Sequence, residues 1–199
     1  MSTDGVNHSK RRLLVAATSV VGAIGAGFVA YPFIASMLPS AKAQAAGAPV
    51  EADIGKLEPG QRMTVEWRGK PVWIVRRTDA NLKDLAGMDA KLRDPNSDME
   101  QQPAYAKNQH RSIKPEYLVV VGICTHLGCS PQYVKIDDPH SLGAEWKGGF
   151  FCPCHGSFFD LAGRVYQGVP APLNLEVPKY SYINDTKIII GVDKEGGAA

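Results

Sequence analysis

Along most of the chain, hydrophobic and polar side chains alternate, which is the pattern of half-buried β-strands. The alternation is clearest over residues 63–68, where Met, Val and Trp are interleaved with Thr, Glu and Arg. A turn at Gly69-Lys70 and a second apolar run over residues 71–77 complete a predicted hairpin. The same reasoning predicts strands over residues 117–123, 149–151, 173–177, 180–183 and 187–192, the last two joined at Asn184-Asp185.

Only residues 81–92 of this part of the chain have a plausible helical pattern. The segment that follows, as far as about Lys114, is rich in Asp, Pro, Asn and Gln and is expected to be a long loop. The 20 Gly and 14 Pro residues also favour a turn-rich β structure over a helix bundle. The predicted fold is mainly β, an antiparallel β-sandwich with one inserted helix and a long loop.

The amino-terminal part has a different pattern, because residues 13–38 are 26 consecutive residues without a charged side chain. A helix of that length exceeds the roughly 30 Å of a bilayer's hydrocarbon core, so we predict a transmembrane anchor. The alternative is a secretory signal cleaved near residues 43–45, but the apolar part of such signals is usually only about 7–15 residues long. The basic residues 10–12 place the amino terminus in the cytoplasm and the rest across the membrane.

Two features flank this anchor. The pair Arg11-Arg12 precedes Leu13-Leu14 and resembles a twin-arginine export signal, although adjacent arginines can also be a topology signal alone. After the anchor, residues 39–50 are small and polar with Pro39 and Pro49, and are expected to be a flexible hinge. The alternative for this segment is an inert spacer.

Composition and charge reduce the number of possible functions. The chain has 199 residues, with 22 Lys+Arg against 20 Asp+Glu and a net charge of +2. This length suits one domain plus an appendage. The near-neutral balance excludes both a protein that coats nucleic acid and an acidic disordered chain. All four cysteines lie between residues 124 and 154, which indicates a site rather than a disulfide framework.

The first of two boxes that carry this site covers residues 124–129, Cys-Thr-His-Leu-Gly-Cys. In an extended segment, residues two apart point to the same side, so Cys124 and His126 can converge on one centre. Cys129 lies beyond a glycine turn and does not converge with these two residues.

The second box covers residues 152–157, Cys-Pro-Cys-His-Gly-Ser. Cys152 and His155 can converge around the proline bend, which leaves Cys154 on the opposite side. Two cysteines and two histidines could hold one tetrahedral zinc ion, although zinc needs no additional thiols. The other possibility is a Rieske centre, in which two Cys hold one iron and two His hold the other.

Together with the loop Gly-Val-Pro-Ala-Pro at 168–172 and the sequence Leu-Asn-Leu-Glu-Val-Pro at 173–178, the boxes closely resemble the Rieske iron–sulfur subunit of bacterial ubiquinol–cytochrome c reductase, the cytochrome bc complex. The resemblance includes the anchor and the hinge and so covers most of the chain. It implies a cytoplasmic amino terminus with the twin-arginine signal (1–12), a transmembrane anchor (13–38), a flexible hinge (39–50) and a periplasmic Rieske domain (51–199), with a cluster-binding subdomain at about 122–172.

The resemblance also implies one [2Fe–2S] cluster and a role for each matching residue. Leu127 would cover the cluster and enter the quinol pocket, and Ser157 would donate a hydrogen bond to a bridging sulfide. The loop 168–172 would shield the cluster. The corresponding alternatives are loop packing for Leu127, a stabilised turn for Ser157 and a sandwich turn for 168–172. The implied ligands are Cys124, His126, Cys152 and His155, and the implied disulfide, which needs an oxidising compartment, is Cys129–Cys154.

One residue departs from the family pattern. Many members carry a tyrosine two residues after the serine of the second box, and its hydroxyl donates to a ligand cysteine sulfur. This chain has Phe159, which lacks that donor.

The activity implied is that of the catalytic redox subunit of a proton-translocating quinol–cytochrome c reductase. The cluster would take one electron from ubiquinol while His155 takes the quinol proton, and the head would then pass the electron to a membrane-bound c-type cytochrome. The implied partners are cytochrome b, the c-type cytochrome, ubiquinol and the lipid bilayer, within a dimeric complex of the bacterial inner membrane and without nucleic acid.

Three alternatives remain at this stage. The Rieske subunit of a periplasmic arsenite oxidase shares the export signal, whereas the soluble ferredoxin of an aromatic-ring oxygenase is disfavoured by the anchor and the additional cysteines. A zinc-binding interaction module would be colourless and would give no paramagnetic resonance signal. Other aromatic side chains are assigned more ordinary roles: His8, His110 and His140 are expected to be solvated loop residues, and Trp67, Trp73 and Trp146 to pack.

Overall fold

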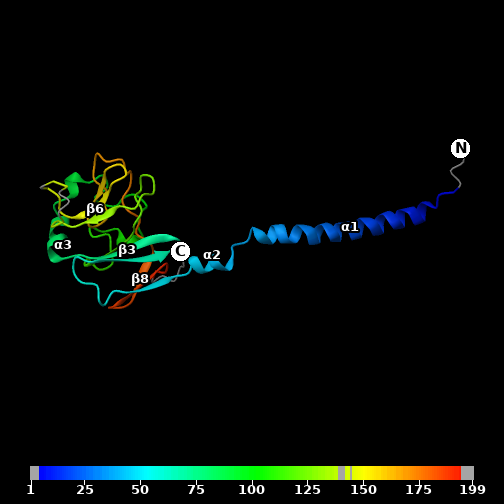
Figure 1. The fold of residues 1–199 in the computed structure, drawn as a ribbon, viewed down its shortest axis with the longest axis horizontal. Coiled ribbons are helices and arrows are strands. Elements are labelled where there is room, and N and C mark those ends of the chain that lie inside the picture. Colours follow the sequence, from blue (N-terminus) through cyan, green and yellow to red (C-terminus); the bar gives the residue numbers. More distant parts are fainter. Residues whose placement is uncertain (1–4, 139–141, 144, 194–199) are drawn as a thin grey trace. The chain divides into compact units, whose positions relative to one another are not determined.

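The computed structural model describes residues 5–138, 142–143 and 145–193, so His140 lies outside the described residues. Contacts within the chain divide it into two units, residues 1–45 and residues 46–199 (Figure 1).

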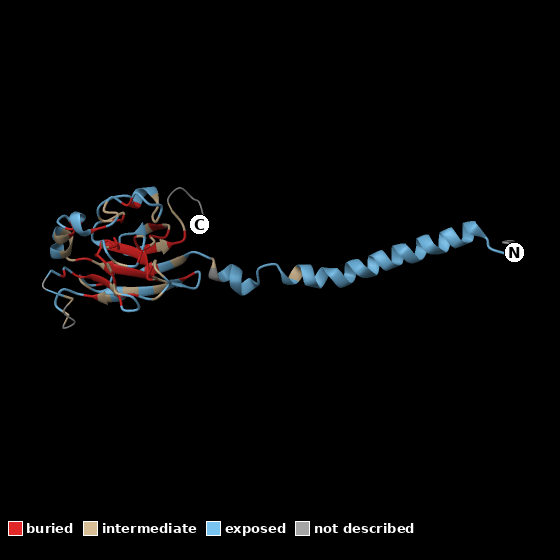
Figure 2. Cartoon of the chain, turned by 90° about the horizontal axis from the view of Figure 1, so that it is seen from above, coloured by how far each residue is buried: buried red, intermediate tan, exposed pale blue. Residues whose placement is uncertain are grey.

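The first unit consists mainly of helix α1 (His8–Ser36), 29 residues and about 43 Å long. Its amino terminus is capped by Asn7, whose side chain accepts a hydrogen bond from the Lys10 amide at 3.0 Å. No residue of α1 is buried (Figure 2), and the helix is long and apolar enough to cross a membrane. Because α1 begins before the apolar run, His8 is helical, and its assignment to a loop was wrong.

A short helix, α2 (Ala41–Ala46), lies within the segment expected to be a hinge. Ser40 precedes it, and its hydroxyl accepts a hydrogen bond from the Ala43 amide at 3.1 Å. Small residues with high helix propensity explain why six residues of this segment form a helix.

In the described part of the second unit there are three antiparallel sheets of three strands each, and Figure 1 labels one strand of each sheet. The first has the order β1 (Val50–Asp53), β9 (Lys187–Ile190), β8 (Tyr180–Asn184). The second has the order β2 (Arg62–Trp67), β3 (Lys70–Arg76), β4 (Tyr117–Val121). The third has the order β5 (Gln132–Val134), β6 (Gly149–Cys152), β7 (Ser157–Phe159).

One hydrophobic core joins the sheets, which is why buried residues concentrate in the strands in Figure 2. It combines residues of the first sheet, such as Ile188, with Val119 of the second and Phe150 of the third. Trp67, Trp73 and Trp146, which were expected to pack in the core or on the surface, are all buried. The mainly β fold predicted from the alternating pattern is confirmed.

The hairpin β2–β3 forms with a turn one residue earlier than predicted. Trp67 pairs with Lys70, so the turn consists of Arg68 and Gly69. Both have positive φ, 53° and 69°, as the tightest hairpin turns require.

Two other predicted elements differ from the structure. Residues 173–177 form no strand. The predicted helix over 81–92 is divided into α3 (Asp79–Leu85) and a 3₁₀ turn (Asp89–Lys91), with Gly87 between them. A second 3₁₀ turn (Ala104–Ala106) lies in the predicted long loop.

Three buried arginines hold the turn of residues 160–164 that follows β7. Arg164 donates from Nε to the Asp160 carboxylate at 2.8 Å, Arg77 to the Leu161 carbonyl at 3.0 Å, and Arg111 to the Ala162 carbonyl at 3.1 Å. Burial lowers the pKa of Arg77 and of Arg111 to about 10, so both remain cationic at neutral pH. The turn that leaves the third sheet is therefore fixed to segments before β4 and after β3.

Candidate metal centre

The first box begins at Cys124, shortly after β4 ends at Val121. The Cys124 amide donates to the Cys129 carbonyl at 2.7 Å, and the Gly128 amide donates to the Cys124 carbonyl at 3.0 Å. These bonds close a tight loop in which Gly128 has a φ of 83°, a conformation that favours glycine. Cys124 is buried at the base of the loop, whereas Leu127 is 72% exposed at its tip.

The second box is the turn between β6 and β7. Cys152 pairs with Ser157, and the Gly156 amide donates to the Cys152 carbonyl at 3.0 Å. Cys152 and Ser157 at the strand ends are buried, while Cys154 and His155 within the turn are exposed.

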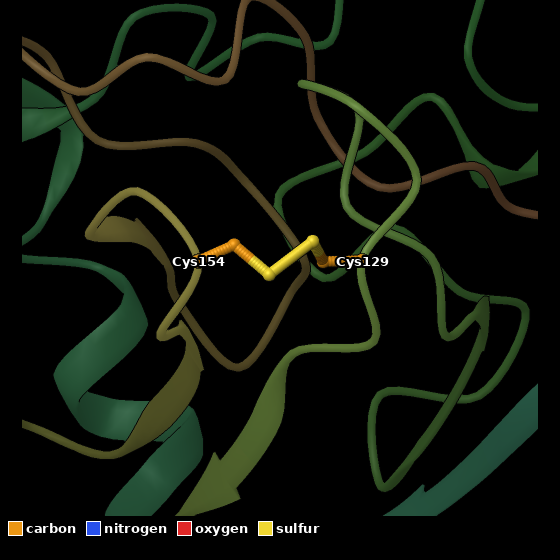
Figure 3. The surroundings of a disulfide bond; sticks show 2 residues. All are labelled: Cys129 and Cys154. Atoms are coloured by element: carbon orange, nitrogen blue, oxygen red, sulfur yellow. A yellow bond between two sulfur atoms is a disulfide. The ribbon is translucent and has the colours of Figure 1, made fainter.

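A disulfide between Cys129 and Cys154 joins the two boxes, with a Cα–Cα distance of 6.7 Å (Figure 3). The sulfur of Cys152 lies within 4.8 Å of both sulfurs of this disulfide. Disulfide sulfurs are not thiolates, so these three cysteines do not form a metal site by themselves. The two free thiols belong to Cys124 and Cys152.

The four candidate ligands form two pairs, and each pair has one member from each box. The imidazole rings of His126 and His155 have centroids 4.7 Å apart and are nearly perpendicular. The Cys124 thiol interacts with the Cys152 thiol, and burial is the main cause that raises the Cys124 pKa.

This donor set fits a Rieske centre. The Nδ1 atom of His126 is buried and has no hydrogen-bond partner among the described residues, as expected for an atom that ligates a metal. The two free, buried thiols and the two contacting imidazoles supply the two Cys and two His that the centre requires. Iron would also favour the thiolate form that burial alone disfavours.

The loop 168–172 is attached to the second box, and the residue that follows the loop is attached to the first. Ser157 accepts a hydrogen bond from the Ala171 amide at 3.0 Å, and its hydroxyl also interacts with the Cys124 thiol. Just beyond the loop, the Leu173 carbonyl accepts from the Thr125 hydroxyl at 2.6 Å.

Two residues that position the boxes were missed by the sequence analysis. Thr125 attaches the first box to Leu173, and its place between Cys124 and His126 was the available signal. Gly122 leaves space for the buried ring of Trp73, and no local pattern indicates this contact.

Comparison with known proteins identifies the family. The family profile described as "Rieske [2Fe-2S] domain" matches residues 49–181, and "Ubiquitinol-cytochrome C reductase Fe-S subunit TAT signal" matches residues 1–40. A curated relative from Allochromatium vinosum, the ubiquinol-cytochrome c reductase iron-sulfur subunit, is 64% identical over 98% of this chain and 94% of its own length. The chain belongs to the Rieske iron–sulfur subunit family.

Other members of the family agree with this assignment. The iron-sulfur subunit from Rhodospirillum rubrum is 43% identical over 96% of each chain. The mitochondrial Rieske subunit of the cytochrome b-c1 complex from Solanum tuberosum is 48% identical over 80% of this chain and 52% of its own.

Membership of the Rieske family confirms the predicted [2Fe–2S] cluster as cofactor. The match to the export-signal profile and the exposed apolar helix α1 together fit a membrane-anchored subunit. His110 was expected to be solvated, but it is half-buried, and its Nδ1 has no hydrogen-bond partner within the described part of the chain.

Proposed function

We propose that this chain is the iron–sulfur subunit of a ubiquinol–cytochrome c reductase and carries single electrons from ubiquinol to a membrane-bound c-type cytochrome. One observation carries the proposal: the two boxes supply two free, buried thiols and bring two imidazole rings into contact. This site occurs in a chain 64% identical to the reductase subunit of Allochromatium vinosum over nearly its whole length.

Each ligand has a proposed role. When bound, the [2Fe–2S] cluster supplies reversible one-electron redox chemistry. Cys124 and Cys152, which are buried, would hold one iron, and His126 and His155, which are more exposed, would hold the other. The disulfide keeps the two boxes together independently of the metal.

His155 is the proposed proton acceptor for ubiquinol. Its side chain is exposed, so its outer ring nitrogen can meet a substrate hydroxyl, and imidazole is suited to proton transfer near neutral pH. Leu127, 72% exposed at the tip of the first box, offers an apolar contact to the quinone ring.

The proposed layout follows the sequence segments. Residues 1–12 stay in the cytoplasm, residues 13–38 cross the bacterial inner membrane, and residues 39–50 act as a hinge. The Rieske domain, from residue 51 onward, lies in the periplasm, with the cluster-binding subdomain at about 122–172. The disulfide supports this orientation, because disulfides persist in oxidising compartments.

The proposed partners are the cytochrome b and c-type cytochrome subunits of a dimeric complex. The exposed apolar side chain of Leu127 can form only one side of a quinol-binding pocket. In this proposal cytochrome b forms the other side and excludes water.

Low-temperature electron paramagnetic resonance of reduced membranes tests the proposal. We expect a rhombic Rieske signal whose shape changes when an inhibitor occupies the quinol site. The signal should be absent from a Cys152→Ala variant, because one iron loses a ligand. A Cys129→Ala variant is the matched control, since it removes a sulfur but no proposed ligand, and should retain a signal of lower thermal stability. The proposal would be contradicted by a Rieske signal of full intensity in Cys152→Ala. It would also be contradicted if the shape of the parent signal did not change when the inhibitor is added.

A further inference from the structure

The free thiol of Cys152 lies unusually close to the disulfide that joins the boxes. Its sulfur is within 4.8 Å of the sulfurs of both Cys129 and Cys154. Cys152 is 1% exposed at the end of β6, so the backbone pairing of that strand holds it beside the disulfide. A thiol in this position is a potential nucleophile toward the S–S bond.

We propose that Cys152 is a site of intramolecular thiol–disulfide exchange whenever the chain lacks its cluster. The Cys152 thiolate attacks the sulfur of Cys129, and a Cys129–Cys152 bond forms as the Cys129–Cys154 bond breaks. The electron pair of the broken bond leaves on the sulfur of Cys154, which takes up the proton given up by Cys152. One thiol and one disulfide are present before and after the step, so no oxidant or reductant is consumed.

The surroundings favour this product over the alternative. Attack on Cys154 would close a ring across Pro153 alone, and the proline restricts the backbone that such a small ring must bend. Attack on Cys129 instead releases the sulfur of Cys154, which is exposed and can be solvated as it leaves. The free thiol therefore moves from a buried residue to an exposed one.

Exchange of this kind opposes cluster binding. The proposal rests on the role of Cys152 as a ligand: once Cys152 is in a disulfide, it has no thiolate to offer iron. A bound cluster would hold the Cys152 sulfur and prevent the attack. The cluster must then be inserted before the disulfide forms, an order compatible with export after folding around a cofactor.

Disulfide mapping of the full-length chain in detergent tests the proposal. The cluster is removed anaerobically with a chelator, and the sample is incubated, alkylated, digested without reduction and analysed by mass spectrometry. We expect a Cys129–Cys152 peptide and alkylated Cys154 to increase together with time. The cluster-loaded chain should yield only the Cys129–Cys154 peptide.

Two variants separate native exchange from scrambling in the unfolded chain. Cys124→Ser keeps the proposed nucleophile and should exchange like the parent, whereas Cys152→Ser should retain only Cys129–Cys154. Unfolded chain, prepared in denaturant, should also give disulfides that contain Cys124. The proposal is overturned if the folded cluster-free chain keeps only Cys129–Cys154, or if disulfides containing Cys124 form in the proportion seen in denaturant. The ligand assignment has its own readout: full visible absorption in Cys152→Ser would remove that role without altering the mapping result.

Discussion

The indole ring of Trp73 occupies the space that a side chain on Gly122 would need. A β-carbon built on Gly122 would lie 2.2 Å from Cε2 of Trp73, which is far inside van der Waals contact. The ring cannot easily retreat, because Trp73 is buried and stacks on Phe150 with a centroid distance of 5.2 Å. Gly122 is itself fixed by a hydrogen bond from its amide to the Pro71 carbonyl. Glycine at this residue therefore sets the position of Cys124, two residues later.

We expect Gly122→Ala to lower the free energy of unfolding by about 1–3 kcal/mol and to reduce cluster content, because the added methyl group must displace Trp73 or the first box. Thermal unfolding and iron per protein measure the two effects. Gly87→Ala is a matched control, since Gly87 is exposed and the nearest atom to its β-carbon would be 3.9 Å away. If the two variants had equal stability and iron content, the ring of Trp73 would not restrict the side chain at residue 122.

Hydrogen bonds to the cluster should set its reduction potential. Reduction adds negative charge, and a hydrogen bond to a charged group is worth roughly 1.5–3 kcal/mol. Since about 1.4 kcal/mol corresponds to about 59 mV for one electron, one donor should shift the midpoint potential by about 60–130 mV. We expect Phe159→Tyr to raise the potential by restoring the family's donor, and Ser157→Ala to lower it. Potentiometric titration measures both shifts.

Two observations bear on that prediction. The Ser157 hydroxyl accepts a hydrogen bond from the Ala171 amide and interacts with the Cys124 thiol, which leaves its own proton available to donate toward the ligands. Ser130→Ala is the control, because Ser130 is exposed beside the first box. If the potential of the Phe159→Tyr variant stayed level or fell, residue 159 would have only a packing role.

Acid should destabilise the second unit through His110. Burial, followed by the charges of Arg77 and Arg164, lowers the pKa of His110 from 6.5. The unfolded chain therefore binds a proton below about pH 6.5 more readily than the folded chain, and stability falls as pH decreases through that value. In His110→Asn, the loss of thermal stability between about pH 7.5 and about pH 5.5 should be smaller than in the parent. If the parent and the variant lost the same thermal stability over this pH range, another titratable group would be responsible for the acid sensitivity.

The hinge prediction concerns residues 39–50, which include α2. A Rieske domain that moves between two redox partners needs a flexible connection to its anchor. Stiffening residues 39–50 should therefore slow electron delivery. We expect Ser40→Pro/Lys42→Pro/Gln44→Pro to lower cytochrome c reduction several-fold while the resonance spectrum of the cluster stays unchanged. The same three residues changed to alanine provide the control. Equal turnover in the proline and alanine variants would favour a passive spacer.

Much of the fold follows from local patterns. The 63–68 alternation locates β2, because one buried face imposes a period of two. The strands β5 and β7 have three residues each, too few for a period to be recognised. Residues 173–177 have a strand-like composition, but their amide and carbonyl groups bond to separate segments, such as Gln101 and Gly163, rather than to one neighbouring strand.

The sequence named candidate ligands more directly than it named the residues that support them. Cysteine and histidine at fixed spacing in two boxes carry enough chemistry to nominate ligands from sequence alone. The residues that support the boxes were not predictable in this way. Arg111 is fully buried and bonds to carbonyls from residues 101, 162, 163 and 175, contacts that arise only when distant segments meet.

The backbone leaves β4 after Val121 and returns to the end of β4 at Glu176. There the Val121 amide donates a hydrogen bond to the Glu176 carbonyl at 2.8 Å. The two ends of the intervening segment are therefore neighbours, as in a domain inserted into a host loop. An insertion with adjacent ends can be exchanged between related proteins without lengthening or rerouting the host chain. We expect chimeras that swap residues 122–175 with a relative to transplant the donor's redox properties, leaving the recipient's anchor and export route unchanged. Recombination at this pair of sites would let evolution adjust the electron carrier and its delivery to the membrane separately.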